Sequence, residues 1–183
     1  MTSVTPATTL DALAFIVCTA FHRVGECIIL SGGGAATVYA PDAYQSRDLD
    51  FVLDFQKSFP GLSAKPLMNL GFRQSGGSYA HPESPFLVEF MTEPPMVGQE
   101  DITSWDTLRR DDLILHILSP TDCVRDRLAA FLWWNDFSAL EQALAVTVRQ
   151  EVDQNLVQAW CQREGKPEKY AIYRDRLARE ASE

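Results

Sequence analysis

The sequence predicts an α+β protein, in which a mixed β-sheet flanked by helices is followed by a C-terminal helical section. Two observations lead to this expectation. Short apolar segments typical of strands come first, and helical periodicity dominates from Pro120 onward. A chain of 183 residues fits one domain, or one domain with an extension. We therefore expect an α/β core over residues 1–118 and a helical section over residues 119–183 that packs on it.

The composition limits the kinds of partner that the protein can have. The net charge of −9 argues against a broad basic surface for a nucleic-acid backbone, and the hydrophobic content of 46% is enough for a sizeable core. The cysteines show no C-x-x-C pairing, so we expect them to be reduced and mostly buried, as in a cytoplasm. The histidines are equally scattered, which makes a zinc site unlikely on spacing grounds. The cysteines are Cys18, Cys27, Cys123 and Cys161.

The N-terminus has no basic segment followed by an apolar segment and a cleavage site. No apolar run is long enough to cross a bilayer. We expect a cytoplasmic protein with no membrane association.

The first half of the chain alternates between helical and strand-like patterns. Apolar residues recur at helical spacing in the first element, and Gly71 is a plausible helix C-cap for the last. In chain order we expect a helix over 9–23, a strand over 27–30, a turn over 31–34, a helix beginning at 35–39, a polar loop over 41–47, a mostly buried strand over 49–55 and a helix over 58–70.

The second half begins with strands and ends with helices. Residues 72–79 and 86–91 are expected to form a β-pair between glycine and proline turns. A Pro-rich loop over 93–98 and one further strand within 105–118 follow. Pro120 suits the first turn of a helix. Helices are expected over 120–134, 138–149, 153–164 and 167–180.

An Asp-x-Asp sequence stands at the start of the strand over 49–55. Side chains two apart on a strand share a face, so Asp48 and Asp50 lie together while Leu49 and Phe51 point into the core. Like charges this close raise each other's pKa unless a cation neutralises them, and Mg²⁺ prefers such hard oxygen ligands. Glu89 completes the cluster if its strand is a neighbour. The structural alternative is a solvated strand edge or turn cap.

Three glycines, Gly32, Gly33 and Gly34, follow a strand and precede a helix-like run. Backbone N–H groups at such a place suit an anion, and the missing Cβ lets a phosphate approach. The alternative is a tight turn that only packs the helix on the sheet. The pattern is neither a Walker A sequence nor G-x-G-x-x-G. Together with the three carboxylates, it favours a site for a divalent metal and a phosphate chain.

These features resemble the DNA polymerase beta-like nucleotidyltransferase superfamily, in which a glycine pair and a helix precede Asp-x-Asp and a later strand carries a third acid. Within it the chain looks most like the AbiEii-type nucleotidyltransferases, which include toxins of toxin–antitoxin pairs. Gly32 to Ala35, and Ser46 two residues before the first Asp, carry this resemblance. It extends more loosely to D-R-L-A-A-F-L-W-W-N-D-F, where Arg127 matches a family lysine and Asp136 a family aspartate. About residues 25–140 are covered.

The resemblance implies a nucleotidyltransferase-like sheet and a mechanism. It implies an NTP substrate, one or two Mg²⁺ (or Mn²⁺) ions, and transfer of an NMP group to an unidentified hydroxyl of a tRNA end, a protein or a small molecule. A cognate antitoxin protein is an expected partner. The implied metal-binding and catalytic residues are Asp48, Asp50 and Glu89, with Glu89 nearest the acceptor, and the implied nucleotide-binding residues are Gly32, Gly33, Gly34, Ser46, Arg127 and Asp136.

Other interpretations remain open at this stage. Arg127 is compatible with a solvated surface position, and Asp136 with a cap of the next helix, a role for which Ser138 and Glu141 also compete as a capping box. Trp133 and Trp134 fit a helix core better than a base-stacking surface. An inactive module of the same fold that binds nucleotide or protein is the main alternative function. A plain interaction protein, with Glu89 on the opposite sheet face, is the third.

Overall fold

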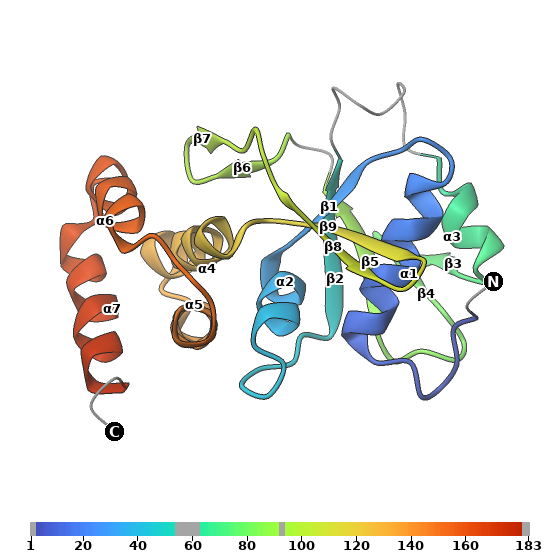
Figure 1. Ribbon diagram of the computed structural model, residues 1–183, viewed down its shortest axis with the longest axis horizontal. Helices are drawn as coiled ribbons and strands as arrows, with labels where there is room; N and C mark the ends of the chain where they lie inside the picture. Colours follow the sequence, from blue (N-terminus) through green and yellow to red (C-terminus); the bar gives the residue numbers. More distant parts are fainter. Residues whose placement is uncertain (1–2, 54–62, 92–93, 181–183) are drawn as a thin grey trace.

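A seven-stranded mixed sheet forms the centre of the molecule, with helices on both sides (Figure 1). The computed structural model describes residues 3–53, 63–91 and 94–180. Within these ranges the strand order is β3-β4-β5-β2-β1-β9-β8, and β6 and β7 form a separate hairpin. The strands are β1 (Ile28–Ser31), β2 (Asp48–Leu53), β3 (Arg73–Ser75), β4 (Ser78–Ala80), β5 (Leu87–Met91), β6 (Met96–Val97), β7 (Glu100–Asp101), β8 (Asp106–Arg110) and β9 (Leu113–Ile117).

The helices divide into an early group and a C-terminal group. Helices α1 and α3 lie on one side of the sheet, and α4 to α7 lie on the other (Figure 1). The four expected C-terminal helices are confirmed to within one residue at each end, which is the normal uncertainty of a helix boundary. The helices are α1 (Leu10–His22), α2 (Gly32–Tyr39), α3 (Lys65–Asn69), α4 (Pro120–Trp134), α5 (Phe137–Arg149), α6 (Gln154–Arg163) and α7 (Pro167–Glu180).

The central strand β2 runs antiparallel to β1 and parallel to β5. Its residues alternate as expected, since Leu49 and Phe51 are fully buried while Asp48 and Asp50 are only half-buried. Helix α1 covers the apolar face of this region, where its Phe21 ring lies 5.3 Å from that of Phe90 on β5. The acidic side chains are therefore on the face that α1 does not cover.

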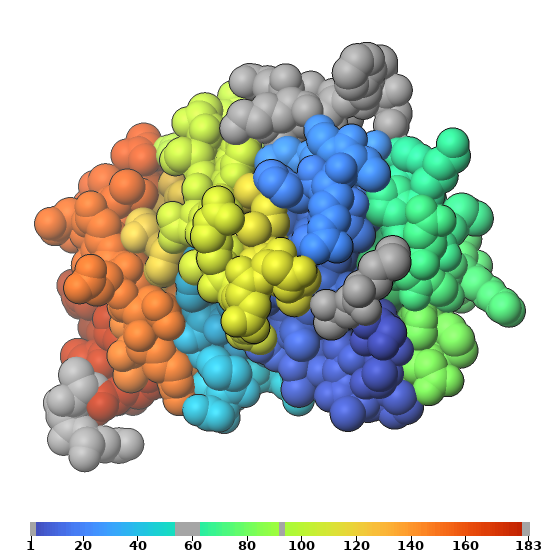
Figure 2. Space-filling model, turned by 45° about the vertical axis from the view of Figure 1, so that its right-hand side comes forward, coloured from blue at the N-terminus to red at the C-terminus, as the bar shows by residue number. Residues whose placement is uncertain are grey.

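The helical section joins the sheet through α2, which contacts both α4 and α5. Its interior is apolar, and Phe131, Leu140 and Trp160 are almost fully buried in it. The β6–β7 hairpin lies against these helices, as the yellow-green segment beside the orange helices shows in Figure 2. Arg125 of α4 and Arg163 of α6 both donate to Glu100 of the hairpin, at 2.5 and 2.7 Å. The hairpin is thus tied to the helices by ion pairs.

The glycines differ from the expectation, because they form the first turn of α2 rather than a turn that precedes it. Of these three glycines, only Gly32 has a left-handed backbone, with φ +65°. A Cβ on Gly34 would lie 3.2 Å from side-chain atoms of both Leu30 and Leu49. Glycine here permits a close approach of helix to sheet, and this packing outweighs its poor helix propensity.

The segment 105–118 is a hairpin of two strands, not the single strand expected. Asp111 makes the turn with φ +53°, a left-handed conformation that Asp tolerates better than most residues. The segment 72–79 likewise holds most of a hairpin, β3–β4, whose second strand pairs with β5. The expected Pro-rich loop contains the short strand β6. Parts of the expected strand over 49–55, helix over 58–70 and loop over 93–98 lie outside the described residues.

All four cysteines are buried thiols, as expected. In the described ranges, no helix combines the length and the apolar character that crossing a membrane requires.

Candidate active site

Three carboxylates share one face of the sheet. Asp48 and Asp50 belong to β2, and in the parallel pairing with β5 the partner of Asp50 is Glu89. Paired residues of neighbouring strands point to the same side, and neighbouring strands lie about 4.8 Å apart. All three side chains are half-buried. The conditional expectation that Glu89 lies on a neighbouring strand is confirmed, and we refer to these three residues as the carboxylate row.

Asp50 is the electrostatic centre of the carboxylate row. Burial raises its pKa, the neighbouring charges of Asp48 and Glu89 raise it further, and the result is a value of about 6. Arg127 acts in the opposite direction. The row is therefore deficient in positive charge, which is the condition under which a cation binds most favourably.

The beginning of α2 is built around Asp50. A Cβ on Gly32 would lie 2.5 Å from Oδ2 of Asp50, and the positive φ of Gly32 also disfavours any other residue. Ser31, the N-cap residue of α2, donates its hydroxyl to the carbonyl oxygen of Asp50 at 3.2 Å. The first N–H groups of the helix are thus brought next to the carboxylate row.

Ser46 connects the second glycine with the first aspartate. Its hydroxyl donates to Oδ1 of Asp48 at 2.8 Å, and a Cβ on Gly33 would lie 3.0 Å from the same hydroxyl. The backbone N–H of Ser46 donates to Oγ1 of Thr37 at 2.9 Å, and that hydroxyl donates to the carbonyl of Gly33 at 3.0 Å. The structure therefore brings Ser46, Gly33 and Asp48 together in one hydrogen-bonded unit.

Arg127 is not a solvated surface residue. Its Nε and Nη2 donate to Oδ2 of Asp126 at 2.9 and 2.7 Å, and Nη1 donates to Oε1 of Gln142 at 3.5 Å. Burial alone would lower its pKa, but the charges of Asp126 and Asp50 leave the pKa of Arg127 above its usual value. Arg127 is thus a cation on α4 within electrostatic reach of the carboxylate row.

Asp126 and Gln142 belong to this region, although sequence reasoning did not single them out. Asp126 pairs with its immediate neighbour, whereas helical ion pairs are usually sought three or four residues apart. Gln142 is 4% exposed, its Nε2 donates to Ser138 at 3.3 Å, and its Oε1 is 3.6 Å from where a Cβ on Gly33 would be. A buried polar position on the inner face of an amphipathic helix was the available indication.

Asp136 occupies a different position. It is exposed, and it is the N-cap of α5, where its Oδ1 accepts the N–H of Ala139 at 3.0 Å. Asp136, rather than Ser138, therefore caps this helix. None of the contacts described for Asp136 reaches the carboxylate row.

The two tryptophans of α4 are on the surface, so the expectation of a core position is wrong. Trp133 is 45% exposed and Trp134 76%. The indole Nε1 of Trp133 donates to Oε2 of Glu164 at 3.0 Å. The core-facing stripe of α4 is instead formed by residues such as Leu128 and Phe131, and α5 and α6 pack against α4.

The donor atoms of the carboxylate row suit a hard divalent cation. In the described part of the chain, no three acidic, histidine or cysteine side chains form a cluster ready to hold a metal. Mg²⁺ is usually bound through one or two carboxylates plus the phosphates of a substrate, and it keeps several waters. Asp48 and Asp50 on one face, with the raised pKa of Asp50, fit that mode of binding.

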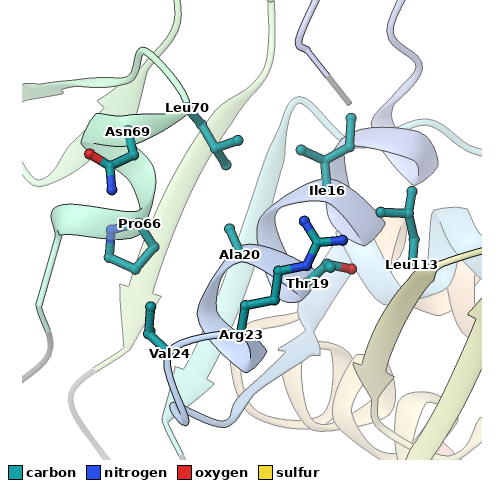
Figure 3. A pocket seen from close by; sticks show the side chains of 9 residues that line it. All are labelled: Ile16, Thr19, Ala20, Arg23, Val24, Pro66, Asn69, Leu70 and Leu113. Carbon is teal, nitrogen blue, oxygen red and sulfur yellow. The ribbon is translucent and has the colours of Figure 1, made fainter. Parts of the chain in front are cut away.

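A separate apolar hollow lies between α1 and α3. It has a volume of about 180 Å³, and α1 contributes Ile16, Thr19, Ala20 and Arg23 to its wall (Figure 3). None of the described residues that line it is acidic. It is therefore not part of the carboxylate site.

Comparison with known proteins supports the fold. No family model matches the chain, and no curated protein shows significant sequence similarity. The crystal structure of an antigenic nucleotidyltransferase-like protein from Paracoccidioides brasiliensis is similar, with a TM-score of 0.55, 14% identity and coverage of 76% of each chain. The expected fold class is thereby confirmed: the chain has a nucleotidyltransferase-like fold. At this identity the likeness concerns the fold alone, and the AbiEii-type resemblance stays a prediction.

Proposed function

We propose that the protein is a metal-dependent nucleotidyltransferase, which moves an NMP group from an NTP to a hydroxyl acceptor. One observation carries this proposal: the pairing of Asp50 with Glu89 places the carboxylates of β2 and β5 on one face, directly beside the glycine start of α2. Such a row is unfavourable for folding, because it raises the pKa of Asp50. A cluster of this cost at a helix N-terminus is typical of a functional site.

The residues divide into those that hold the metal and those that hold phosphate. Asp48 and Asp50 would hold Mg²⁺ or Mn²⁺ together with phosphate oxygens, and the ion would neutralise charge on the attacking and leaving oxygens. The N–H groups at Gly32 and Gly33 would donate to the β- and γ-phosphates. The hydroxyl of Ser46 would join them by turning away from Oδ1 of Asp48 when that carboxylate binds the metal. Arg127 would add a positive charge from α4, held in orientation by Asp126 and Gln142.

Glu89 has the role closest to the acceptor. Its carboxylate would accept the hydroxyl proton as the new bond forms between the acceptor oxygen and the α-phosphorus. The bond from the α-phosphorus to the bridging oxygen breaks at the same time, and pyrophosphate leaves with that electron pair. Removal of Glu89 should therefore lower the rate more than it lowers NTP affinity.

The direct test measures pyrophosphate release and transfer of label from α-³²P-NTPs in the presence of Mg²⁺. Asp48→Asn and Asp50→Asn should each reduce transfer by about a thousandfold or more, because removal of an electrostatic centre costs that much in other enzymes. Asp112→Asn is the matched control, since Asp112 is exposed and pairs only with Arg23 at 3.2 Å in the contacts described. Failure of the wild type to bind Mg²⁺-NTP would contradict the proposal.

A catalytically inactive module that binds nucleotide is the second candidate. It is favoured by the lack, in the described residues, of a ready three-ligand metal cluster, and by arginine at the position of the family lysine. Its signature is NTP binding without pyrophosphate release, unchanged by Glu89→Gln. Measurement of binding and turnover on the same preparation separates the two candidates.

The AbiEii-type resemblance extends the proposal to a toxin that a cognate antitoxin controls. Induced expression should then arrest growth for the wild type and not for Asp50→Asn at equal protein level. Equal growth of both strains would leave the transferase proposal intact and would remove the toxin role.

A further inference from the structure

The carboxylate row has two chemically different ends. At the Asp48 end lie Leu87, which is the strand partner of Asp48, and the hydroxyl of Ser46, which donates to Asp48 and lies beside Gly33 of α2. At the other end, the next side chains on the same face are Val52 of β2 and Met91 of β5, which alternation places beside Asp50 and Glu89. The Asp48 end therefore has polar groups beside β2 and an apolar side chain on β5, whereas the other end is apolar on both strands.

This polarity gives the transfer reaction a direction. In an in-line displacement, the attacking and leaving oxygens lie on opposite sides of the phosphorus. Pyrophosphate held by Ser46 and Gly33 leaves toward the Asp48 end. The acceptor hydroxyl must then approach from the end formed by Val52 and Met91. This step rests on the proposed function.

That end opens into two adjoining cavities. The first, of about 130 Å³, is lined mainly by apolar side chains that include Val52, Met91 and Leu118. The second, of about 470 Å³, lies between α4 and the β6–β7 hairpin. Met96 and Asp126 line both, so the two cavities adjoin at these residues. We name this path, from Val52 to Trp134, the acceptor tract.

Hydrogen bonds and ion pairs join the two walls of the acceptor tract. Besides the ion pairs of Glu100, the N–H of Gln99 donates to Oε1 of Glu164 at 3.1 Å, and Gly98 leaves room for that carboxylate. Glu164 also accepts from Trp133. A cavity that is formed in advance costs less to occupy than one that must be ordered by its ligand.

The chemistry of the tract favours a neutral ligand. Of its acidic groups, Asp126 is paired with Arg127 and Glu164 accepts hydrogen bonds from Trp133 and Gln99, while the ammonium of Lys166 lies 4.8 Å from the ring centre of Trp133. Arg127 is already paired with Asp126, so no row of free cations runs along the lining for a polynucleotide backbone. The large surfaces offered are apolar, since Met96 is 45% exposed and Trp134 76%.

We propose that the acceptor is an uncharged molecule with an aromatic or aliphatic body and a free hydroxyl, bound in the acceptor tract with the hydroxyl toward Glu89. The body packs on Met96 and Trp134, where methionine adapts to different shapes and the indole provides a stacking face. The balanced reaction joins acceptor–OH and NTP to give acceptor–O–NMP, pyrophosphate and a proton. Polar contacts hold the phosphates, and apolar contacts select the acceptor.

The test uses three acceptors with the full chain, Mg²⁺ and labelled NTP. N-acetyl-L-tyrosinamide and 2-phenylethanol are the apolar probes, and a short single-stranded RNA with a free 3′ hydroxyl is the polyanionic one. Ala130→Trp fills the second cavity, and Ala171→Trp on α7 is the control at a half-buried alanine outside the tract. Ala130→Trp should raise the KM of the apolar probes about tenfold or more, with NTP affinity unchanged.

The outcomes separate the acceptor proposal from the proposed function. If the wild type does not bind Mg²⁺-NTP, the transferase proposal fails with it. If NTP binds but neither apolar probe is labelled, or if the RNA is labelled and Ala130→Trp does not impair it, the acceptor proposal alone is overturned. Loss of NTP affinity in Ala130→Trp, but not in Ala171→Trp, would assign the tract to the nucleotide and would also overturn it.

Discussion

The two faces of β2 are made of adjacent residues and have opposite roles. Leu49 and Phe51 are fully buried and pack in the core. Asp48 and Asp50 are half-buried in a row of like charges. The apolar face stabilises the fold by burial. The acidic face destabilises it, as the raised pKa of Asp50 shows. One strand thus supports the fold and carries the proposed chemistry.

Because the two faces of β2 differ in this way, single substitutions on one strand can change stability and function separately. A change on the apolar face should lower stability and leave the chemistry of the folded fraction intact. A change on the acidic face should do the reverse.

Phe51→Ala should destabilise the protein by about 3–5 kcal/mol, because it removes a fully buried aromatic side chain and leaves a cavity. The ring also lies 6.2 Å from that of Phe90, a stacking contact that would be lost. Urea unfolding followed by circular dichroism measures the change. NTP binding by the folded fraction should persist, and complete loss of it at low temperature would contradict the separation of the two faces.

Asp50→Asn should stabilise the metal-free protein at neutral pH. The pKa of folded Asp50 is raised to about 6, whereas the ordinary pKa of an aspartate is 3.8. Between these values the folded state binds more protons than the unfolded state, so its stability falls as pH rises, by on the order of 2 kcal/mol. The substitution removes this penalty. Its gain in melting temperature should therefore be clear at pH 7.5 and small at pH 4.

Mg²⁺ with NTP provides the second arm of that experiment. It should raise the melting temperature of the wild type and have little effect on Asp50→Asn, because the ligand stabilises the state that it binds. A melting temperature of Asp50→Asn that is lower than that of the wild type at pH 7.5 without metal would contradict the charge argument.

The sequence was sufficient to predict which side chains of β2 share a face, because this depends only on neighbouring residues. The alternation of Asp48 to Phe51 follows from the period of a strand, and the buried stripe of each C-terminal helix follows from the helical period. The pairing of Asp50 with Glu89 could be stated only as a condition. Residues 39 positions apart meet through a register that the chain selects by packing as a whole, not by local preference.

The glycine region was harder to predict, because its conformation depends on a distant side chain. Glycine usually indicates a turn, so a turn over 31–34 was the natural expectation. In the structure α2 begins at Gly32, and residue 32 must be glycine because Oδ2 of Asp50 fills the space of a Cβ there. The prediction that Trp134 is buried was wrong for a related reason. Its size predicts burial, but α5 and α6 cover other parts of α4.

Gly32→Ala should destabilise the protein by about 1–2 kcal/mol from its left-handed backbone alone, and the new methyl group would also collide with Oδ2 of Asp50. Displacement of Asp50 should weaken Mg²⁺-NTP binding. Gly76→Ala is the matched control, since Gly76 also has a positive φ, of 63°, but has open space around its Cβ position. Calorimetric NTP titration of both variants measures the difference. Equal affinity would show that the collision does not reach the site.

Substitutions of Asp136 are expected to have the smallest effect on stability. They separate the two roles that the sequence left open, which are helix capping and nucleotide binding. Asp136→Ala removes the N-cap of α5 and should cost about 1 kcal/mol, whereas Asp136→Asn should cost little, because Asn caps as well as Asp. If Asp136 only caps, Asn restores both stability and NTP affinity. If it binds nucleotide through its charge, Asn restores stability alone. Its exposed position leads us to expect the first result, from melting temperatures and NTP titrations of both variants.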